Sequence, residues 1–222
     1  MENKVIFTET GDNKTFDICK EAIQKAEISK KYVLILAHTY KGVETIDREY
    51  RKQNKGVIDF NVVIKTWRDF LLADWIKPCQ CLLKLKDEYF NDFEVPENFI
   101  QFIDFDNEHN KDFKSSCIWY YINEKTHNVR ENRMRHLSYV CNSHSQNKII
   151  DRLTEIYSHI FIDEVQEYVA GYDLKLFNLL FKSKIDIICV GNYKSKKIID
   201  YFKLKEEKKE CVIEYSSKNI YI

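Results

Sequence analysis

Residues 159–166, His-Ile-Phe-Ile-Asp-Glu-Val-Gln, place two adjacent carboxylates at the end of a short apolar run. Such a run predicts a buried parallel strand, and ligands of parallel sheets bind at the carboxyl ends of the strands. In a nucleotide-hydrolysing site, Asp163 would hold magnesium through water, Glu164 would take a proton from the attacking water, and Gln166 would contact the terminal phosphate. The alternative is an acidic N-cap of a helix that follows the strand.

The N-terminal region has the order of a phosphate-binding loop. A short strand over residues 4–7 is followed by a turn over residues 8–15 and an amphipathic helix to about residue 26. In such a loop, backbone N–H groups surround the phosphates, a lysine neutralises their charge and a threonine hydroxyl binds magnesium. The residues predicted to bind the nucleotide are Gly11, Asn13, Lys14 and Thr15, and Thr15 together with Asp163 is predicted to hold the metal.

This loop departs from the intact spacing Gly-x-x-x-x-Gly-Lys-Thr, which would require glycine at positions 8 and 13. The chain has Thr8 and Asn13 there. Asparagine tolerates left-handed backbone angles, so the change at position 13 is compatible with the loop. Thr8 and the anionic Asp12 are less compatible with the binding of a triphosphate in this loop. The alternative for residues 11–15 is an ordinary turn and helix cap.

Four segments, residues 32–40, 66–72, 159–166 with 170–174 following, and 185–191, occur in an order and spacing that resemble UvrD/Rep-like superfamily 1 DNA helicases. The resemblance covers the first RecA-like core domain and nearly the whole chain. Its most specific stretch is residues 156–191, in which Asp-Glu-x-Gln precedes Gly-Tyr-Asp-Leu and a hydrophobic strand that ends in Val-Gly. It implies a P-loop NTPase fold that binds ATP with magnesium.

The resemblance also implies roles for single residues. Lys14 and Thr15 match the phosphate-loop lysine and the magnesium-binding threonine, whereas Asp163 and Glu164 match the magnesium carboxylate and the catalytic base. Gln166 matches the glutamine that links the nucleotide to DNA. The positions that match contacts to single-stranded DNA are His38, Thr39, Thr66 and Trp67.

Two departures from the family limit the expected activity. After Gly191 the family usually continues Asp-Pro-x-Gln, whereas residues 192–195 read Asn-Tyr-Lys-Ser. A helicase of this type also needs a second core that supplies arginines to the transition state, and 222 residues encode one core. We therefore expect a truncated, degenerate UvrD-like ATPase domain that binds ATP and magnesium weakly and acts with a partner, without unwinding DNA alone.

Two alternatives to this function stay open. One is a non-enzymatic protein-interaction module on a helicase-derived scaffold, and the other is one half of a split DNA helicase. The expected partner is a protein, such as the second half of a helicase, a nuclease or another helicase, and single-stranded DNA is a possible ligand.

Composition indicates a cytoplasmic protein that does not enter a membrane. Lysine plus arginine equals aspartate plus glutamate at 35 each, which provides no global electrostatic attraction for nucleic acid. Seven scattered cysteines without a signal peptide are typical of reduced thiols. The Cys79-Gln-Cys81 spacing is too short for a zinc pair. No apolar run approaches the roughly twenty residues that span a bilayer.

Alternating strands and helices predict an α/β fold, with a parallel sheet that has helices on both faces. We expect a RecA-like core over residues 1–78 and 150–222 and an inserted subdomain over residues 79–149. A helix over residues 66–76 should end before Pro78, and Lys14 should face Asp163 across a cleft at the ends of neighbouring strands. The expected core of the insertion is Phe90, Phe93, Phe99, Phe102, Phe105 and Phe113.

Overall fold

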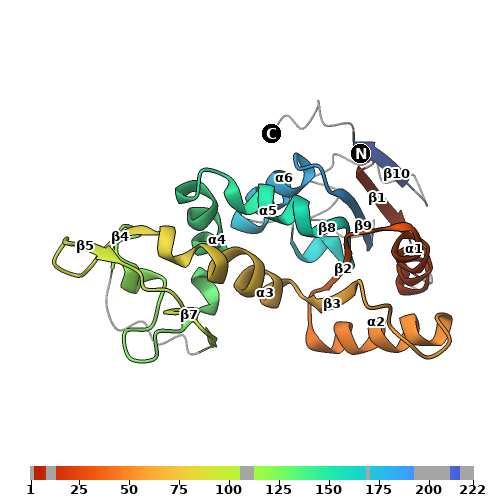
Figure 1. Cartoon of the computed structure of the whole chain (residues 1–222), viewed down its shortest axis with the longest axis horizontal. Helices are drawn as coiled ribbons and strands as arrows, with labels where there is room; N and C mark the ends of the chain where they lie inside the picture. The colour runs from red at the N-terminus through yellow and green to blue at the C-terminus, as the bar shows by residue number, and fades with distance from the viewer. Residues whose placement is uncertain (1–2, 9–13, 106–112, 169–170, 193–210, 216–222) are drawn as a thin grey trace. The chain divides into compact units, whose positions relative to one another are not determined.

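A computed structural model describes residues 3–8, 14–105, 113–168, 171–192 and 211–215, of which residues 7, 8 and 211–215 are described by their backbone alone. The chain forms two compact units (Figure 1). The first contains residues 1–67 and 152–222, and the second contains residues 68–151. The second unit therefore begins eleven residues before the predicted boundary at residue 79.

The first unit is built on a six-stranded sheet in the order β10-β1-β9-β8-β2-β3. Five of its strands, β1, β9, β8, β2 and β3, run parallel, and β10 pairs antiparallel with β1. The predicted α/β class with a parallel sheet is confirmed. The elements of this unit are β1 (Asn3–Thr8), α1 (Lys14–Ile28), β2 (Tyr32–Ala37), α2 (Tyr40–Gln53), β3 (Val62–Thr66), β8 (Tyr157–Ile162), a 3-10 turn η4 (Val165–Glu167), α6 (Gly171–Phe181), β9 (Asp186–Asn192) and β10 (Cys211–Tyr215).

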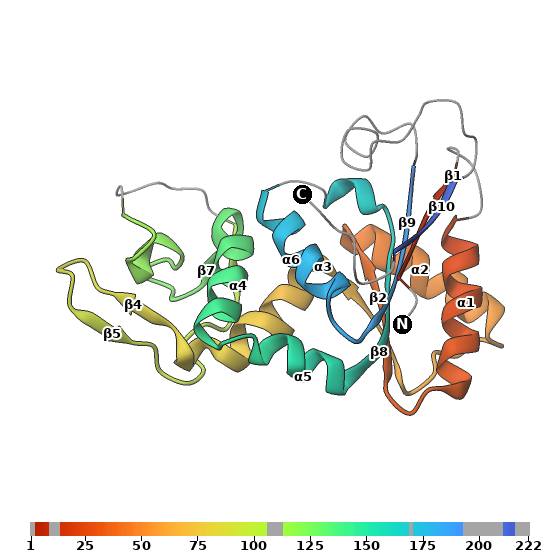
Figure 2. The same cartoon turned by 90° about the horizontal axis from the view of Figure 1, so that it is seen from above.

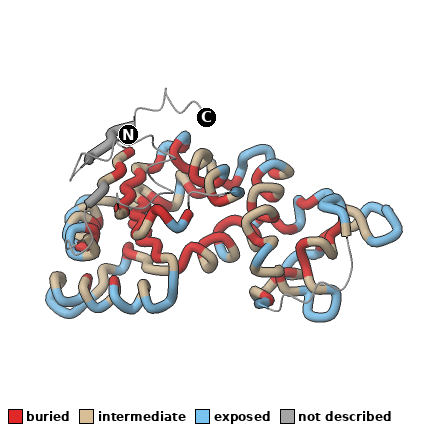
Figure 3. The backbone as a smooth tube through the Cα atoms, turned by 180° about the vertical axis from the view of Figure 1, so that it is seen from behind, coloured by how far each residue is buried: buried red, intermediate tan, exposed pale blue. Residues whose placement is uncertain are grey.

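The central strands are apolar because both faces of the sheet are covered. Helices α1 and α2 lie on one face and α6 lies on the other (Figure 2). Buried residues run through these strands (Figure 3). The core between α1, α2 and the sheet includes Ile18, Cys19, Ala22, Val33, Ile35, Ile46, Tyr50, Phe161 and Val190.

The strand order shows where this sheet could bind a ligand. All five parallel strands end at one edge of the sheet. The connection from β1 to β2 crosses the positions of β9 and β8, and the later connection from β8 to β9 runs across the sheet in the opposite direction. Such a change of direction is where open α/β sheets bind ligands. Because β9 lies between β1 and β8, the expectation that Lys14 and Asp163 follow neighbouring strands is wrong.

The second unit has short elements and two small sheets, formed by β4 with β5 and by β6 with β7. Helix α5 leads from it back to the first unit. The elements from β3 onward are α3 (Trp67–Phe70), a π-helical segment η1 (Leu71–Ile76), a 3-10 segment η2 (Lys77–Leu82), β4 (Lys84–Lys86), β5 (Asp92–Glu94), β6 (Ile103–Asp104), a 3-10 turn η3 (Ile118–Tyr120), β7 (Val129–Arg130), α4 (Glu131–His144) and α5 (Lys148–Ile156).

The helix predicted over residues 66–76 differs from the structure at both ends. Thr66 is the last residue of β3, so the helical stretch begins at Trp67. It then continues through Pro78 to Leu82. Pro78 is tolerated because it is in the first turn of η2, where its missing N–H is not needed for a helical hydrogen bond.

The predicted phenylalanine core of the second unit is wrong for three of its members. Phe90, Phe102 and Phe105 are each more than half exposed. A cationic side chain lies over each ring, from Lys114, Lys77 and Arg68 respectively. The buried residues come instead from the helical segments and the chain around η3, and they include Leu71, Trp75, Ile76, Val95, Ile100, Ile118, Tyr121, Ile122, Val129, Met134, Leu137 and Cys141.

Candidate functional site

The carboxyl edge of the sheet brings together residues that are about 150 positions apart in the chain. Lys14 begins α1, and Glu164 is the second residue after β8. Lys14 Nζ lies 3.8 Å from Glu164 Oε1, with the lysine side chain 10% exposed and the glutamate side chain 43% exposed. Gly11, Asp12 and Asn13 lie outside the described residues. The two ends of the predicted site therefore meet through a half-buried ion pair.

Asp163 is a buried carboxylate whose surroundings do not fully compensate its charge. Its Oδ1 accepts a hydrogen bond from the Glu164 amide at 2.9 Å. Burial, followed by the charge of Glu164, raises the pKa of Asp163 to about 6. The Glu164 amide, Lys14 and the Thr15 hydroxyl act in the opposite direction on this pKa but do not offset the burial. A cation beside Asp163 would favour its ionised form.

Gln166 connects the carboxylates to the end of β9. Its Nε2 donates a hydrogen bond to Glu164 Oε2, and its Oε1 accepts one from the Asn192 amide at 3.1 Å. Glu164 itself adopts a left-handed conformation with φ 54°, which turns the chain sharply after Asp163. Both carboxylate oxygens of Glu164 thus have partners, Lys14 on one side and Gln166 on the other.

Two of the residues predicted to contact DNA are inaccessible. Thr66 and Trp67 are each 1% exposed. Trp67 Nε1 donates a hydrogen bond to Asp173 Oδ1 at 2.7 Å, and the indole packs against the rings of Tyr168 and Phe177. The prediction of DNA contact is therefore wrong for these two side chains, because the junction of β3 with α3 turns Trp67 into the core.

The other two predicted DNA contacts lie at the carboxyl end of β2. Thr39 is exposed, but its hydroxyl caps α2 by accepting a hydrogen bond from the Gly42 amide at 3.0 Å. The half-buried His38 ring lies edge-on to Tyr168 with centroids 5.5 Å apart. Thr39 thus has a structural role at the same edge of the sheet as Lys14 and Asp163.

Tyr168 is part of this region although no sequence pattern marked it. Its ring is buried, and its hydroxyl has no hydrogen-bond partner among the residues that the structure describes. Burial, followed by the charges of Asp163 and Asp173, raises the pKa of Tyr168, so the phenol stays neutral. Such an unsatisfied buried hydroxyl costs stability.

A pocket of about 470 Å³ adjoins Lys14 and Thr15. Phe16 and one face of α2 complete its lining, with residues at positions 45, 48, 49 and 52. This spacing of three and four residues, which is typical of one face of a helix, is the only sign of the pocket in the sequence, because the packing of α2 beside α1 depends on residues far apart in the chain.

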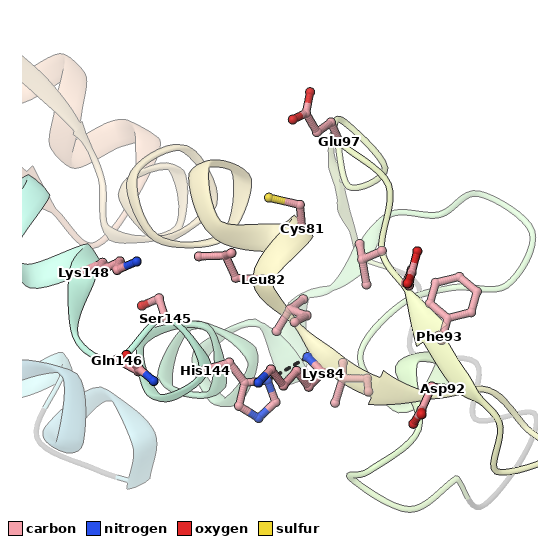
Figure 4. Close-up of a pocket in the computed structure, with 14 residues that line it drawn as sticks. Cys81, Leu82, Lys84, Asp92, Phe93, Glu97, His144, Ser145, Gln146 and Lys148 are labelled. Atoms are coloured by element: carbon pink, nitrogen blue, oxygen red, sulfur yellow. Dashed lines mark hydrogen bonds between the residues drawn. The ribbon is translucent and has the colours of Figure 1, made fainter.

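A larger pocket, of about 780 Å³, lies within the second unit (Figure 4). There His144 Nδ1 accepts a hydrogen bond from the Lys84 amide at 2.9 Å, which places the ring proton on Nε2. Burial and the charge of Lys84 lower the pKa of His144. The pocket contains Lys84 and Lys148 but also Asp92, Glu94 and Glu97, so its charge does not select one kind of ligand. None of the predicted site residues lines it.

Within the described residues, no group of three or more His, Cys, Asp or Glu side chains could hold a metal ion. A metal at Thr15 and Asp163 would therefore need further ligands from a bound molecule or from water. No helix in the described part of the chain is long and apolar enough to cross a membrane.

No protein-family model matches the chain, and no curated protein matches it.

Proposed function

We propose that this chain is a nucleoside-triphosphate-binding domain with a RecA-like core and a degenerate phosphate loop, of the UvrD/Rep-like helicase type. It binds ATP with magnesium weakly and acts with a protein partner. The observation that carries the proposal is the meeting of Lys14, at the start of α1, with Asp163 and Glu164, at the end of β8. This edge of a parallel sheet is where nucleotides bind in such folds.

The residues present are suited to a triphosphate with magnesium. Thr15 and Asp163 offer the hydroxyl and carboxylate oxygens that magnesium accepts, and hydrogen bonding from the Thr15 hydroxyl lowers the pKa of Asp163. Magnesium bound there would neutralise charge on the phosphates. Lys14 would bind the outer phosphate oxygens, assisted by the N–H groups in the first turn of α1. Gln166 would hold Glu164 in place, because it bonds both to the Glu164 carboxylate and to the Asn192 amide at the end of β9.

The same contacts explain why binding should be weak and hydrolysis slow. Lys14 is already paired with Glu164, so a phosphate must displace a carboxylate to reach it. Glu164 also accepts a hydrogen bond from Gln166, which reduces its capacity to take a proton from water. Asp12 lies in the predicted loop and adds a further negative charge there.

A second candidate function is protein interaction. The second unit has accessible aromatic side chains, the exposed rings of Phe90, Phe102 and Phe105. Aromatic residues are enriched in protein interfaces, and the excess of acidic residues over 86–112 disfavours a nucleic-acid backbone as the partner.

Calorimetric titration with a non-hydrolysable ATP analogue, with and without magnesium, tests the proposal. Lys14→Ala should weaken binding by about tenfold or more, because Lys14 supplies the main positive charge for the phosphates. Lys20→Ala is the matched control, since Lys20 is an exposed lysine of the same helix. Equal affinities in Lys14→Ala and Lys20→Ala, or no heat from the wild type, would contradict the proposal.

A further inference from the structure

The pocket of about 470 Å³ that begins at Lys14 and Thr15 extends along one face of α2. Its volume falls in the range of small-molecule sites. Helices α1 and α2 pack against each other within the first unit, so both sides of the pocket belong to the same compact part of the chain. A phosphate held at Lys14 and Thr15 would border this pocket, and the charges that α2 carries there would act on it.

Three cationic side chains line the pocket, and two of them already have an acidic partner. Lys14 Nζ lies 3.8 Å from Glu164 Oε1. Lys52 Nζ lies 3.6 Å from Glu49 Oε2. The third cation, Arg48, makes no hydrogen bond or ion pair with any residue that the structure describes. Arg48 is therefore the cation of this pocket that no acid in the described part of the chain neutralises.

Arg48 differs in this respect from Arg51, the other arginine of α2. Arg51 Nε donates a hydrogen bond to Asp47 Oδ2 at 2.8 Å, an ion pair across one turn of the helix. Glu44 is four positions before Arg48, at the spacing that allows such a pair, but among the described residues the two side chains do not bond. The exposed guanidinium of Arg48 therefore remains available to an anionic ligand.

We propose that Arg48 binds the phosphates of the nucleotide and does so from the same core as Lys14. The inference rests on the proposed function, because it takes the triphosphate to be at Lys14 and Thr15. A phosphate that reaches Lys14 must displace Glu164, whereas a phosphate that reaches Arg48 displaces no carboxylate of the described chain. The planar guanidinium can donate two parallel hydrogen bonds to two oxygens of one phosphate. Arg48 thus gives the single core a phosphate-binding arginine that does not depend on a second core.

The acid that lines the pocket is not free to recognise a base. Glu49 Oε1 accepts a hydrogen bond from Gln53 Nε2 at 2.9 Å, and Glu49 Oε2 lies beside the Lys52 ammonium. Both oxygens of this carboxylate therefore have partners on α2, which leaves Arg48 as the available polar group of that helix in the pocket. Arg48 acts on the phosphates, so its effect should be the same for a nucleotide and for a phosphate chain without a base.

Calorimetry with a non-hydrolysable ATP analogue and with tripolyphosphate, both with magnesium, tests the inference. Arg48→Ala should weaken the binding of both ligands by about tenfold, because each loses a charge-assisted hydrogen bond. Arg48→Lys keeps the charge without the planar guanidinium, so it should weaken binding by about threefold. Arg51→Ala is the matched control, because Arg51 pairs with Asp47 and does not line the pocket, and its affinities should stay within about twofold of the wild type.

The outcomes separate this inference from the proposed function. Binding of the ATP analogue that weakens in Lys14→Ala but is equal in Arg48→Ala and Arg51→Ala overturns the role of Arg48 and leaves the nucleotide site standing. A loss in Arg48→Ala for the ATP analogue but not for tripolyphosphate places Arg48 at the nucleoside and also overturns the inference. Tripolyphosphate binding that needs Arg48, without binding of the ATP analogue, supports phosphate binding by Arg48 and overturns the nucleotide site. Absence of binding by both ligands overturns both proposals.

Discussion

If the edge of the sheet binds a triphosphate as proposed, Glu164→Gln should tighten that binding, although the resemblance to helicases implies that Glu164 is a catalytic base. The substitution keeps a side chain that can bond to Gln166 but removes the charge that holds Lys14. Two unit charges 3.8 Å apart attract by about 4 kcal/mol at an effective dielectric constant of about 20. Because the Glu164 side chain is 43% exposed, solvent reduces the net value to about 0.5–1 kcal/mol.

Release of Lys14 should therefore increase affinity by about two- to fivefold. A second effect has the same direction: the charge of Glu164 raises the pKa of Asp163, so its removal favours the ionised carboxylate that magnesium needs. Titration calorimetry with an ATP analogue and magnesium measures the change. Glu167→Gln, which removes the charge of an exposed side chain in the same turn, is the control. Binding that is weaker in Glu164→Gln, or equally tightened in both variants, would refute competition between Glu164 and phosphate for Lys14.

Three further predictions concern buried polar groups near the site. Tyr168→Phe should raise the free energy of unfolding in urea by about 1 kcal/mol, since it removes a buried hydroxyl that has no partner within the described part of the chain. A loss of stability would mean that the hydroxyl is satisfied. The pKa of Asp163 is raised in the folded state from 3.8 to about 6, so the folded state binds the proton more tightly and stability should fall as pH rises from about 4 to about 6. Asp163→Asn should then raise the free energy of unfolding at pH 7 by on the order of 2 kcal/mol relative to wild type. In urea titrations, this variant should lack this part of the pH dependence of stability. Trp67→Phe should destabilise the fold by about 2 kcal/mol, because it leaves Asp173 without its indole donor, and it should leave the affinity for a single-stranded oligonucleotide, measured by fluorescence anisotropy, unchanged.

The part of the site predicted from the sequence is the part with strong local patterns. The run before Asp163 is apolar and short, and these two properties predict the buried strand with carboxylates at its end that the structure has. The approach of Lys14 to the carboxylates needed the family resemblance, because local patterns do not specify which strands share an edge. The insertion of β9 between β1 and β8 was missed for the same reason: strand order depends on packing between residues far apart in the chain.

The second unit was poorly predicted because its aromatic residues do not follow one period. A phenylalanine with a cation over its ring can remain at the surface, so aromatic content alone did not identify the core. Trp67 shows the opposite error. Its burial depends on Asp173, which is 106 positions away and supplies the acceptor that a buried indole N–H requires.

The contacts at the carboxyl edge also show how the two candidate functions differ physically. Lys14, Glu164, Gln166 and Asn192 form a continuous set of polar contacts that is satisfied without a ligand. If the chain is only a scaffold, this set is structural, and loss of Lys14 should change stability by no more than a partly exposed ion pair does, about 0.2–1 kcal/mol, with no effect on nucleotides. If the edge binds a triphosphate, the same lysine exchanges one anionic partner for another, and its loss removes affinity far more than stability. Asp163 favours the second case, because a buried carboxylate with a raised pKa is costly to a scaffold and useful to a cation site.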